Sequence, residues 1–235
     1  MKILFISDTH FGYDFELAYY TVKRILDTTK PDLVLSGGDW DFDKELISKH
    51  GVSWFSELFS DYTVYSILGN HDLESGDKDA IKIVMNLKNS NGSRVFFSGL
   101  IDFNGVKILG VPGLIEDVKE LEYIKKTLLK YRNSEPDFLL MHDCPEWHLI
   151  NIKNYVVSTV KPKNILCGHI HDESFKMKQE DYYIESTDTL CTNYSVKKNV
   201  NIIKIITTPP FTGYALIDYN PESGSINSIT LGRVV

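Results

Sequence analysis

Cysteine is scarce in this sequence, and long apolar runs are absent. The three cysteines are odd in number and far apart: Cys144, Cys167 and Cys191. They form neither a CxxC pair nor a disulfide framework, so we expect a reducing compartment, with hydrophobic packing as the role of the first two. No apolar run approaches the roughly 20 residues of a membrane helix, and the opening "MKILFISD" reaches Asp8 too soon for a signal peptide. These absences predict a cytoplasmic protein without a membrane segment.

Clustered positive charge is also missing. The chain has 25 Lys and Arg residues against 32 Asp and Glu residues, a formal net charge of −7. A protein that holds a long phosphate backbone needs clustered lysine and arginine, and the nearest such block is "SVKKNVNIIK" near the tail. Nucleic acid is therefore an allowed but not a favoured partner. A small phosphorylated substrate remains compatible with this composition, because bound metal ions can reverse the local field.

Linkers, internal repeats and low-complexity segments are absent as well. With 235 residues, 43% of them hydrophobic, the chain can bury a core without disulfides or metal staples. We therefore predict a single domain over residues 1–235, in which residues 172–235 form a β-rich tail.

Short apolar runs alternate with longer amphipathic segments along most of the chain. The runs are "KILFIS", "PDLVLSGG", "YTVYSILG", "DFLLMH" and "KNILCGH", each typical of a strand covered on both faces. Helical periodicity predicts helices over residues 15–29, 43–60, 77–89, 116–132 and 145–159. The segment 94–113 predicts a hairpin around Asn104 and Gly105, and the chain after His171 is rich in strand-like runs. This pattern predicts an α/β fold of two packed β-sheets with helices outside.

Polar side chains of a particular kind follow the ends of the apolar runs. They are Asp8, His10, Asp39, Asn70, His71, His142, His169 and His171. The carboxyl ends of the strands in an α/β sheet form its ligand crevice, so these residues are expected at one edge. Members two positions apart, such as Asp8 and His10, would face the same way on an extended backbone. For His50 and His148, in helix-like segments, exposure or light packing is the better interpretation.

The chemistry of this set points to metal ions. Mixed carboxylate, imidazole and amide ligands suit borderline divalent metals such as Mn, Fe, Co, Ni or Zn. The eight groups are too many for one ion, but they suit two ions that share a carboxylate and leave positions for water and substrate. Any one of these residues alone is more simply a cap or a turn residue, so the argument depends on the whole set.

Five short motifs carry a resemblance to a known family. They are "DTH" (8–10), "GGD" (37–39), "GNHD" (69–72), "MH" (141–142) and "GHIH" (168–171). Together they resemble the calcineurin-like metallophosphoesterase superfamily. The resemblance implies a four-layer α/β/β/α sandwich of two mixed β-sheets flanked by helices, with the β-rich tail completing the second sheet.

The resemblance also implies a role for each motif residue. Two divalent transition-metal ions are expected, with Mn preferred and Fe, Co, Ni or Zn as alternatives. The implied ligands are Asp8, His10 and His171 for one ion, Asn70, His142 and His169 for the other, and Asp39 as the bridge. In the family His71 binds no metal and faces the substrate as a proton donor, and Asp72 is expected to orient that imidazole.

One motif departs from the family pattern. Many relatives have an Asp three residues after the bridging Asp, where this chain has Phe42, flanked by Asp41 and Asp43 in "GDWDFD". The protein-phosphatase branch has an Arg soon after this motif and Glu after "GNH", whereas this chain has Asp72. A Ser/Thr protein phosphatase is therefore not expected.

The reaction expected from the resemblance is hydrolysis of a phosphate ester. A water activated by the two metals attacks phosphorus, and His71 protonates the leaving alkoxide. The substrate we expect is a small phosphodiester such as a cyclic or modified nucleotide; the alternatives are a phosphomonoester, DNA or RNA, and a non-catalytic metal-binding scaffold. Tyr13 and Trp40 are candidate platforms for a nucleobase, with packing as the alternative for each. Nothing in the sequence selects an oligomeric state.

Overall fold

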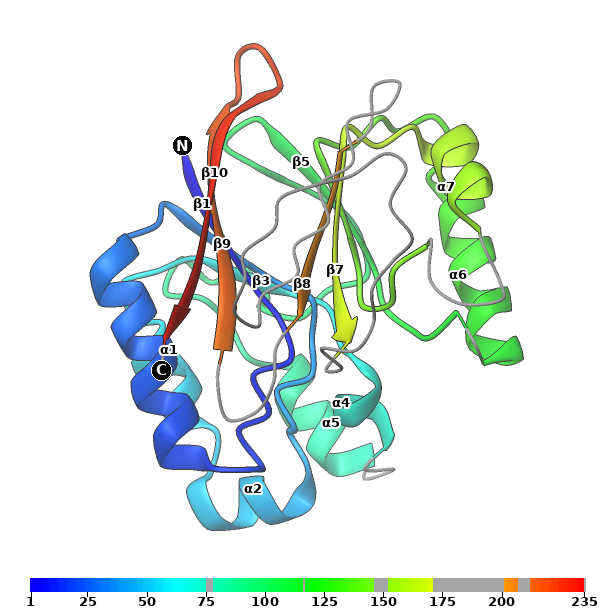
Figure 1. The fold of residues 1–235 in the computed structure, drawn as a ribbon. Coiled ribbons are helices and arrows are strands. Elements are labelled where there is room, and N and C mark those ends of the chain that lie inside the picture. Colours follow the sequence, from blue (N-terminus) through cyan, green and yellow to red (C-terminus); the bar gives the residue numbers. More distant parts are fainter. Residues whose placement is uncertain (75–77, 116, 146–151, 171–200, 207–211, 235) are drawn as a thin grey trace.

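The strands form two five-stranded sheets (Figure 1). The computed structural model describes residues 1–74, 78–115, 117–145, 152–170, 201–206 and 212–234. The first sheet has the order β10-β9-β1-β2-β3, with β1 (Lys2–Ile6), β2 (Leu33–Ser36), β3 (Val64–Ser66), β9 (Thr212–Asn220) and β10 (Ser225–Val234). The second sheet has the order β4-β5-β6-β7-β8, with β4 (Gly99–Phe103), β5 (Val106–Val111), β6 (Phe138–Met141), β7 (Asn164–Ile170) and β8 (Asn201–Ile206).

Helices cover the outer faces of the two sheets. Those of the first half are α1 (Phe15–Thr29), α2 (Lys44–His50), α3 (Ser53–Leu58), α4 (Asn70–Glu74) and α5 (Lys78–Met85); those of the second half are α6 (Val118–Lys130) and α7 (Lys153–Val160). One core cluster joins α1, α2 and α3 to the first sheet, and another joins α6 and α7 to the second. Figure 1 shows α1 and α6 on opposite sides of the paired sheets. The four-layer α/β/β/α sandwich is confirmed.

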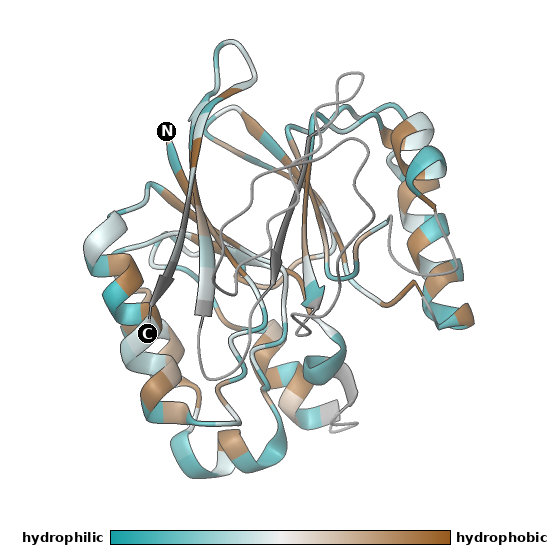
Figure 2. Cartoon of the chain, in the orientation of Figure 1, coloured by the Kyte–Doolittle hydropathy of each residue, from teal (hydrophilic) through white to brown (hydrophobic). Residues whose placement is uncertain are grey.

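The apolar strands are explained by burial on both faces. In β1, Leu4 and Ile6 belong to the cluster beneath the helices, whereas Ile3 and Phe5 belong to the cluster between the sheets. Figure 2 shows apolar residues concentrated on the strands between the helical layers. Because side chains alternate between the two faces of a strand, a strand that is covered on both faces needs a continuous apolar run.

Side-chain caps and one glycine set the helix boundaries. Asp14 and Asp43 begin α1 and α2 by accepting hydrogen bonds from the backbone N–H groups of Leu17 and Leu46. The prediction of one helix over residues 43–60 is wrong, because the chain turns at Gly51 and continues as α3. Gly51 has φ +68°, a conformation that glycine adopts without steric cost and that ends a helix.

The prediction of the hairpin is confirmed, whereas the prediction for the β-rich tail is not. Strands β4 and β5 pair antiparallel around Asn104 and Gly105, which have φ +50° and +83°, as a two-residue hairpin requires. The tail does not complete the second sheet alone, which corrects that expectation. Of the tail strands that the structure describes, β8 alone joins the second sheet; β9 pairs antiparallel with β1, and β10 extends the first sheet beyond β9.

Some expectations lie outside the described residues. They concern His148, His171 and Cys191, together with most of the region between His171 and β8. Cys144 and Cys167 are described, and both are buried in the core cluster beneath α6 and α7, as predicted. Within the residues that the structure describes, no helix has the length and apolar character needed to cross a bilayer.

Candidate metal centre

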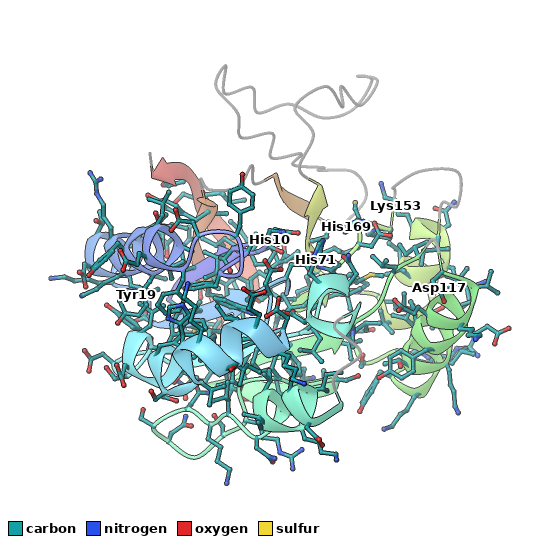
Figure 3. The ribbon with its side chains drawn as sticks, turned by 90° about the horizontal axis from the view of Figure 1, so that it is seen from below. His10, Tyr19, His71, Asp117, Lys153 and His169 are labelled. Atoms are coloured by element: carbon teal, nitrogen blue, oxygen red, sulfur yellow. The ribbon has the colours of Figure 1, made fainter. Side chains whose placement is uncertain are left out.

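The predicted polar residues gather where the strands of both sheets end. Three chain segments of the first sheet and two of the second contribute. Asp8 follows β1, Asp39 follows β2, Asn70 begins α4 after β3, His142 follows β6, and His169 lies near the end of β7. Figure 3 shows His10, His71 and His169 close together, with Tyr19 and Asp117 toward opposite sides of the molecule. The edge predicted from strand order is therefore a real meeting point of side chains.

The backbone around this meeting point is strained. Five of the ten non-glycine residues with positive φ among the described residues belong to it: Asp8, His10, Asp39, Asp41 and His169. Their φ values run from +47° to +71°, in a region that costs energy for residues with a Cβ. The expectation of an extended backbone through Asp8 and His10 is therefore wrong, although both side chains do reach the centre. Such strain is concentrated at functional sites, where the surrounding structure imposes it.

Two motif glycines allow the chain segments to approach one another. A Cβ at Gly69 would overlap Oδ1 of Asp39, and a Cβ at Gly168 would overlap Oδ2 of Asp8 and Oγ of Ser7. The missing side chains thus let two carboxylates lie directly against neighbouring backbone. This close approach explains why glycine precedes Asn70 and His169 in the sequence.

The side chain of Asp39 lies at the middle of the cluster. Its Oδ1 accepts a hydrogen bond of 2.9 Å from the backbone N–H of His71. Its Oδ2 is buried and accepts no hydrogen bond, yet Nε2 of His142 lies 3.3 Å from it and Nε2 of His10 lies 3.9 Å from it. Two imidazoles from different sheets therefore converge on one carboxylate oxygen.

The hydrogen bonds of both imidazoles leave Nε2 facing the centre. Nδ1 of His142 donates to the carbonyl oxygen of Gly37 at 2.8 Å, because a carbonyl can only accept. Nε2 of the same ring lies 2.8 Å from Oδ1 of Asn70. Nδ1 of His10 contacts Oδ1 of Asp41 at 2.8 Å. Fixing one ring nitrogen in this way presents the other as a metal ligand.

The carboxylate of Asp8 is held by the backbone near the end of β7. The backbone N–H of His169 donates to both of its carboxylate oxygens, at 2.9 and 3.0 Å. The rings of His142 and His169 lie edge to face, with centroids 4.9 Å apart. These contacts join the ends of β1, β6 and β7.

The electrostatics of the cluster favour positive charge. Burial raises the pKa of Asp39, but the imidazoles of His142, His10 and His71 outweigh burial and lower it. Burial lowers the pKa of His142, but the carboxylates of Asp39 and Asp8 outweigh it and raise that pKa to about 10. For His10 burial again acts downward, and Asp41 makes the net shift in pKa upward. The buried carboxylates thus create a negative field in which a cation is stabilised.

These residues fit metal ions. Ligand atoms of Asp39, His142 and His169 lie within 4.8 Å of one another, and so do those of Asp8, His10 and Asp39. Asp39 belongs to both groups, and its buried Oδ2 offers a lone pair that no hydrogen bond uses. Mixed nitrogen and oxygen donors of this kind suit borderline divalent cations. His171, the remaining implied ligand, lies outside the described residues.

Comparison with protein-family models assigns the chain to a family. Residues 1–196 match the model of the calcineurin-like phosphoesterases. The chain belongs to that family. The family supports a metal-dependent phosphoesterase that acts on small phosphorylated substrates. In this calcineurin-like phosphoesterase the two ligand groups that share Asp39 agree with a dinuclear centre, and His10, Asp41 and His71 form a third close group.

Solved structures share the fold at low sequence identity. A phosphatase of Mycoplasma pneumoniae matches at a TM-score of 0.56 and 11% identity, covering 100% of this chain and 93% of that one. The calcineurin-like phosphoesterase YfkN of Bacillus subtilis matches at 0.51 and 14% identity, covering 99% and 90%. A 5′-nucleotidase precursor of Thermus thermophilus matches at 0.53 and 12% identity, covering 100% of this chain but 54% of that one. Comparison with curated protein sequences gave no match.

Asp72 does not orient His71 in this calcineurin-like phosphoesterase, which corrects the expected role. Its carboxylate accepts hydrogen bonds of 2.9 to 3.0 Å from the backbone N–H groups of Asp39, Trp40 and Gly69. Burial and the charge of Asp39 raise the pKa of Asp72 to about 7. Asp72 therefore joins the loops after β2 and β3, because its oxygens are directed at their backbone.

The carboxylate of Asp41 lies beside the imidazoles of His10 and His71. Its Oδ1 lies 2.8 Å from Nδ1 of His10 and 3.8 Å from Nδ1 of His71. The rings of His10 and His71 lie edge to face with centroids 4.8 Å apart. Sequence reasoning missed Asp41; its one signal was the spacing of two residues from Asp39, which Asp43 at a spacing of four obscured.

The other residues of "GDWDFD" serve the fold. Trp40 is fully buried and donates through Nε1 to Oγ of Ser66 at 2.9 Å, so it cannot be a platform for a nucleobase. Phe42 is buried against Trp54, and Asp43 begins α2. At the position where many relatives have Asp, this chain thus uses Phe42 for the core, and the neighbouring Asp41 contacts His10.

Proposed function

We propose that this protein hydrolyses a small phosphodiester with two divalent metal ions, and that His71 is the general acid. The observation that carries the proposal is the position of Asp39 Oδ2. It is buried, it accepts no hydrogen bond, and it lies between imidazole nitrogens of His10 and His142. A carboxylate oxygen between two sets of ligands is the arrangement that a bridging ligand needs.

The proposed ligand sets are those that the family resemblance implies, and the close groups of ligand atoms support them in part. Asp8, His10 and Asp39 would hold one ion together with His171, and Asp39, Asn70, His142 and His169 would hold the other. Bound divalent cations supply Lewis acidity and lower the pKa of water, which is the chemistry that phosphate-ester hydrolysis needs. The oxygen donors suit Mn²⁺, the metal we expect first, and the imidazoles also allow Fe, Co, Ni or Zn.

The exposure of His71 supports its proposed role as the proton donor to the leaving group. Its side chain is 51% exposed, at the rim of the centre, whereas His142 is fully buried. Asp41 and His10 lie on the two sides of its ring. In the reaction the bond between phosphorus and the leaving oxygen breaks, His71 protonates that oxygen, and water supplies the new hydroxyl on phosphorus. Such positioned acids contribute on the order of 10²–10⁴-fold to the rate.

The charge near His71 favours a diester over a monoester. A hollow of about 490 Å³ lies there, and its described lining residues are His10, Gly12, Tyr13, Asp41, Asp43 and His71. This lining has two carboxylates and no lysine or arginine. A monoester at neutral pH carries up to two negative charges, whereas a diester carries one. Beyond the region whose field the bound metal ions would reverse, these carboxylates therefore repel the monoester more strongly.

The test is a reconstitution series on the whole protein. Metal is stripped, and Mn, Fe, Co, Ni or Zn is added back singly before hydrolysis of bis(p-nitrophenyl) phosphate and of p-nitrophenyl phosphate is measured. We expect the diester to be hydrolysed faster, with Mn²⁺ the best metal. Monoester preference would favour the phosphomonoesterase alternative. Turnover with none of the metals would refute the enzyme and support the metal-binding scaffold.

A further inference from the structure

A second hollow adjoins the one beside His71. Its volume is about 420 Å³, and it shares three lining residues with the first: Gly12, Tyr13 and Asp43. It extends from this shared wall to the beginnings of α1 and α2. Figure 1 shows α2 beside the end of α1 at which that helix begins. The two hollows are therefore neighbours, with Gly12, Tyr13 and Asp43 forming the wall between them.

Tyr13 forms part of the wall common to both hollows. Its side chain is 73% exposed, the most exposed large hydrophobic residue of the described chain. Its backbone N–H donates to the carbonyl of His10 at 3.0 Å, so the turn that carries Tyr13 also carries a proposed ligand. An exposed aromatic ring on this turn, close to the reacting group, offers a face on which another aromatic ring can stack.

The rest of the second hollow is aromatic and acidic. Phe15 and His50 stack at its far end, with ring centroids 3.8 Å apart. Among its described lining residues are four carboxylates and one lysine: Asp14, Glu16, Asp43 and Glu45, and Lys49. Asp14 and Asp43 also cap helices, and Glu16 and Glu45 are exposed. A further phosphate in this hollow would be repelled, whereas a neutral aromatic group would not.

We propose that the second hollow binds the leaving alcohol of the substrate, with Tyr13 stacking on its aromatic ring and the carboxylates rejecting alcohols that carry another phosphate. This inference rests on the proposed function and narrows it. The substrate class is a diester whose leaving group is an uncharged nucleoside, rather than an internal position of a nucleic-acid strand. The second hollow is assigned to the leaving alcohol because it shares a wall with the hollow that His71 lines, and His71 is the proposed donor to the leaving oxygen.

The stacking part is tested with two diesters that differ in aromatic character. The dinucleoside monophosphate ApA has nucleoside leaving groups, and glycerophosphoglycerol has neutral leaving groups without a ring. Relative to glycerophosphoglycerol, Tyr13→Ala is expected to lower kcat/KM for ApA roughly 5- to 100-fold, the range for loss of one stacked base. Tyr13→Phe should restore the ratio, because it retains the ring. An unchanged ratio in Tyr13→Ala overturns the stacking role.

The charge part is tested with ApA and its 3′-phosphorylated form, ApAp. We expect the wild type to prefer ApA, and the double variant Glu16→Lys/Glu45→Lys to reduce that preference about tenfold at low salt, with a smaller change at high salt. Glu122→Lys, an equal charge change per site on the exposed side of α6, is the matched control. A preference that changes equally in the control and the double variant, or not at all, overturns the charge selection.

Failure of this inference is distinguishable from failure of the proposed function. Bis(p-nitrophenyl) phosphate reports the metal-dependent diester hydrolysis directly. If it is hydrolysed but ApA is not, the proposed function stands and the assignment of the second hollow is wrong. If no diester is hydrolysed with any metal, the proposed function itself fails.

Discussion

Replacement of Asp41 tests whether this carboxylate supports the metal ion that His10 is proposed to bind. Oδ1 of Asp41 lies 2.8 Å from Nδ1 of His10, and the two side chains are 14% and 8% exposed. A hydrogen bond that involves a charged group contributes roughly 1.5–3 kcal/mol. At about 1.4 kcal/mol per factor of ten, this free energy corresponds to roughly a 10- to 100-fold loss of metal affinity. The same range is typical when a residue that orients a metal ligand is removed. Asp41→Ala should therefore weaken metal binding about 10- to 100-fold.

Asp41→Asn should have a smaller effect, because its amide oxygen can still accept the hydrogen bond from His10. Hydrogen bonds with an ionised partner are roughly twice as strong as neutral ones, so about half of the free energy is retained. We expect a loss of about 3- to 15-fold. Metal affinity should therefore be lowest in Asp41→Ala, intermediate in Asp41→Asn and highest in the wild type. This graded order distinguishes the loss of one contact from a general loss of folding.

The assay is a titration of the stripped protein with Mn²⁺, followed by calorimetry and by diester hydrolysis. One of the two binding steps should weaken, because Asp41 contacts His10 and not His142, whose Nδ1 is held by Gly37. At saturating Mn²⁺ most of the activity should return, because the distance from Asp41 to His71 is 3.8 Å, beyond a hydrogen bond. Asp27→Asn, which removes a carboxylate from an exposed pair on α1, is the control. Wild-type affinity at both steps in Asp41→Ala would refute the reasoning.

Four further substitutions give separate expectations. His71→Asn should lower kcat roughly 10²–10⁴-fold with metal content intact, and near-wild-type turnover would refute the acid role. Asp39→Asn should lose metal first, which elemental analysis would detect, since its Oδ2 lies between both ligand groups. Tyr219→Phe removes a 2.6 Å hydrogen bond to Asp137 far from the centre, so thermal melts should show a loss of roughly 1.5–3 kcal/mol without lower activity. Because Lys163, Tyr219 and Lys107 outweigh burial and lower the pKa of Asp137, that loss should be full above about pH 4 and shrink as the pH falls through the lowered value. Gly168→Ala should impair both folding and metal binding, since the new Cβ overlaps a carboxylate oxygen; a normal melting temperature and metal content would contradict this.

The layer order of the fold followed from patterns that depend on a few residues at a time. An apolar run buried on both faces implies layers on both sides of a sheet, and Asn104-Gly105 indicates a hairpin wherever it lies between strand-like runs. The prediction of a single helix over residues 43–60 was wrong because Gly51 ends the first helix, although the apolar periodicity continues on both sides of it. The prediction for the tail was wrong for another reason. Strand-like residues at 212–220 indicate a strand but not its partner, and the pairing of this strand with β1 joins segments far apart in the sequence.

At the candidate centre, too, residue type and strand order predicted which residues gather, but not which contacts they make. Strand ends and residue types alone brought Asp8, Asp39, Asn70, His142 and His169 to one edge, because the carboxyl ends of strands share an edge whatever the loops do. Which carboxylate supports which imidazole could not be read in this way. Asp72 is adjacent to His71 in sequence, yet its oxygens bond backbone N–H groups of two loops, and the nearby carboxylate comes from Asp41.

Sequence by itself determined the fold class, the family resemblance and the identity of the gathered residues, because these depend on residue type and on order along the chain. Tertiary structure alone decided the left-handed backbone at the ligands, the contact of Asp41 with His10, the contacts of Asp72 with backbone N–H groups, the burial of Trp40 and the exposure of Tyr13. The physical reason is that side-chain direction depends on local φ and ψ and on how closely loops approach, and neither is set by residues adjacent in sequence. Gly69 and Gly168 show this most directly, since the contacts that require them come from other strands.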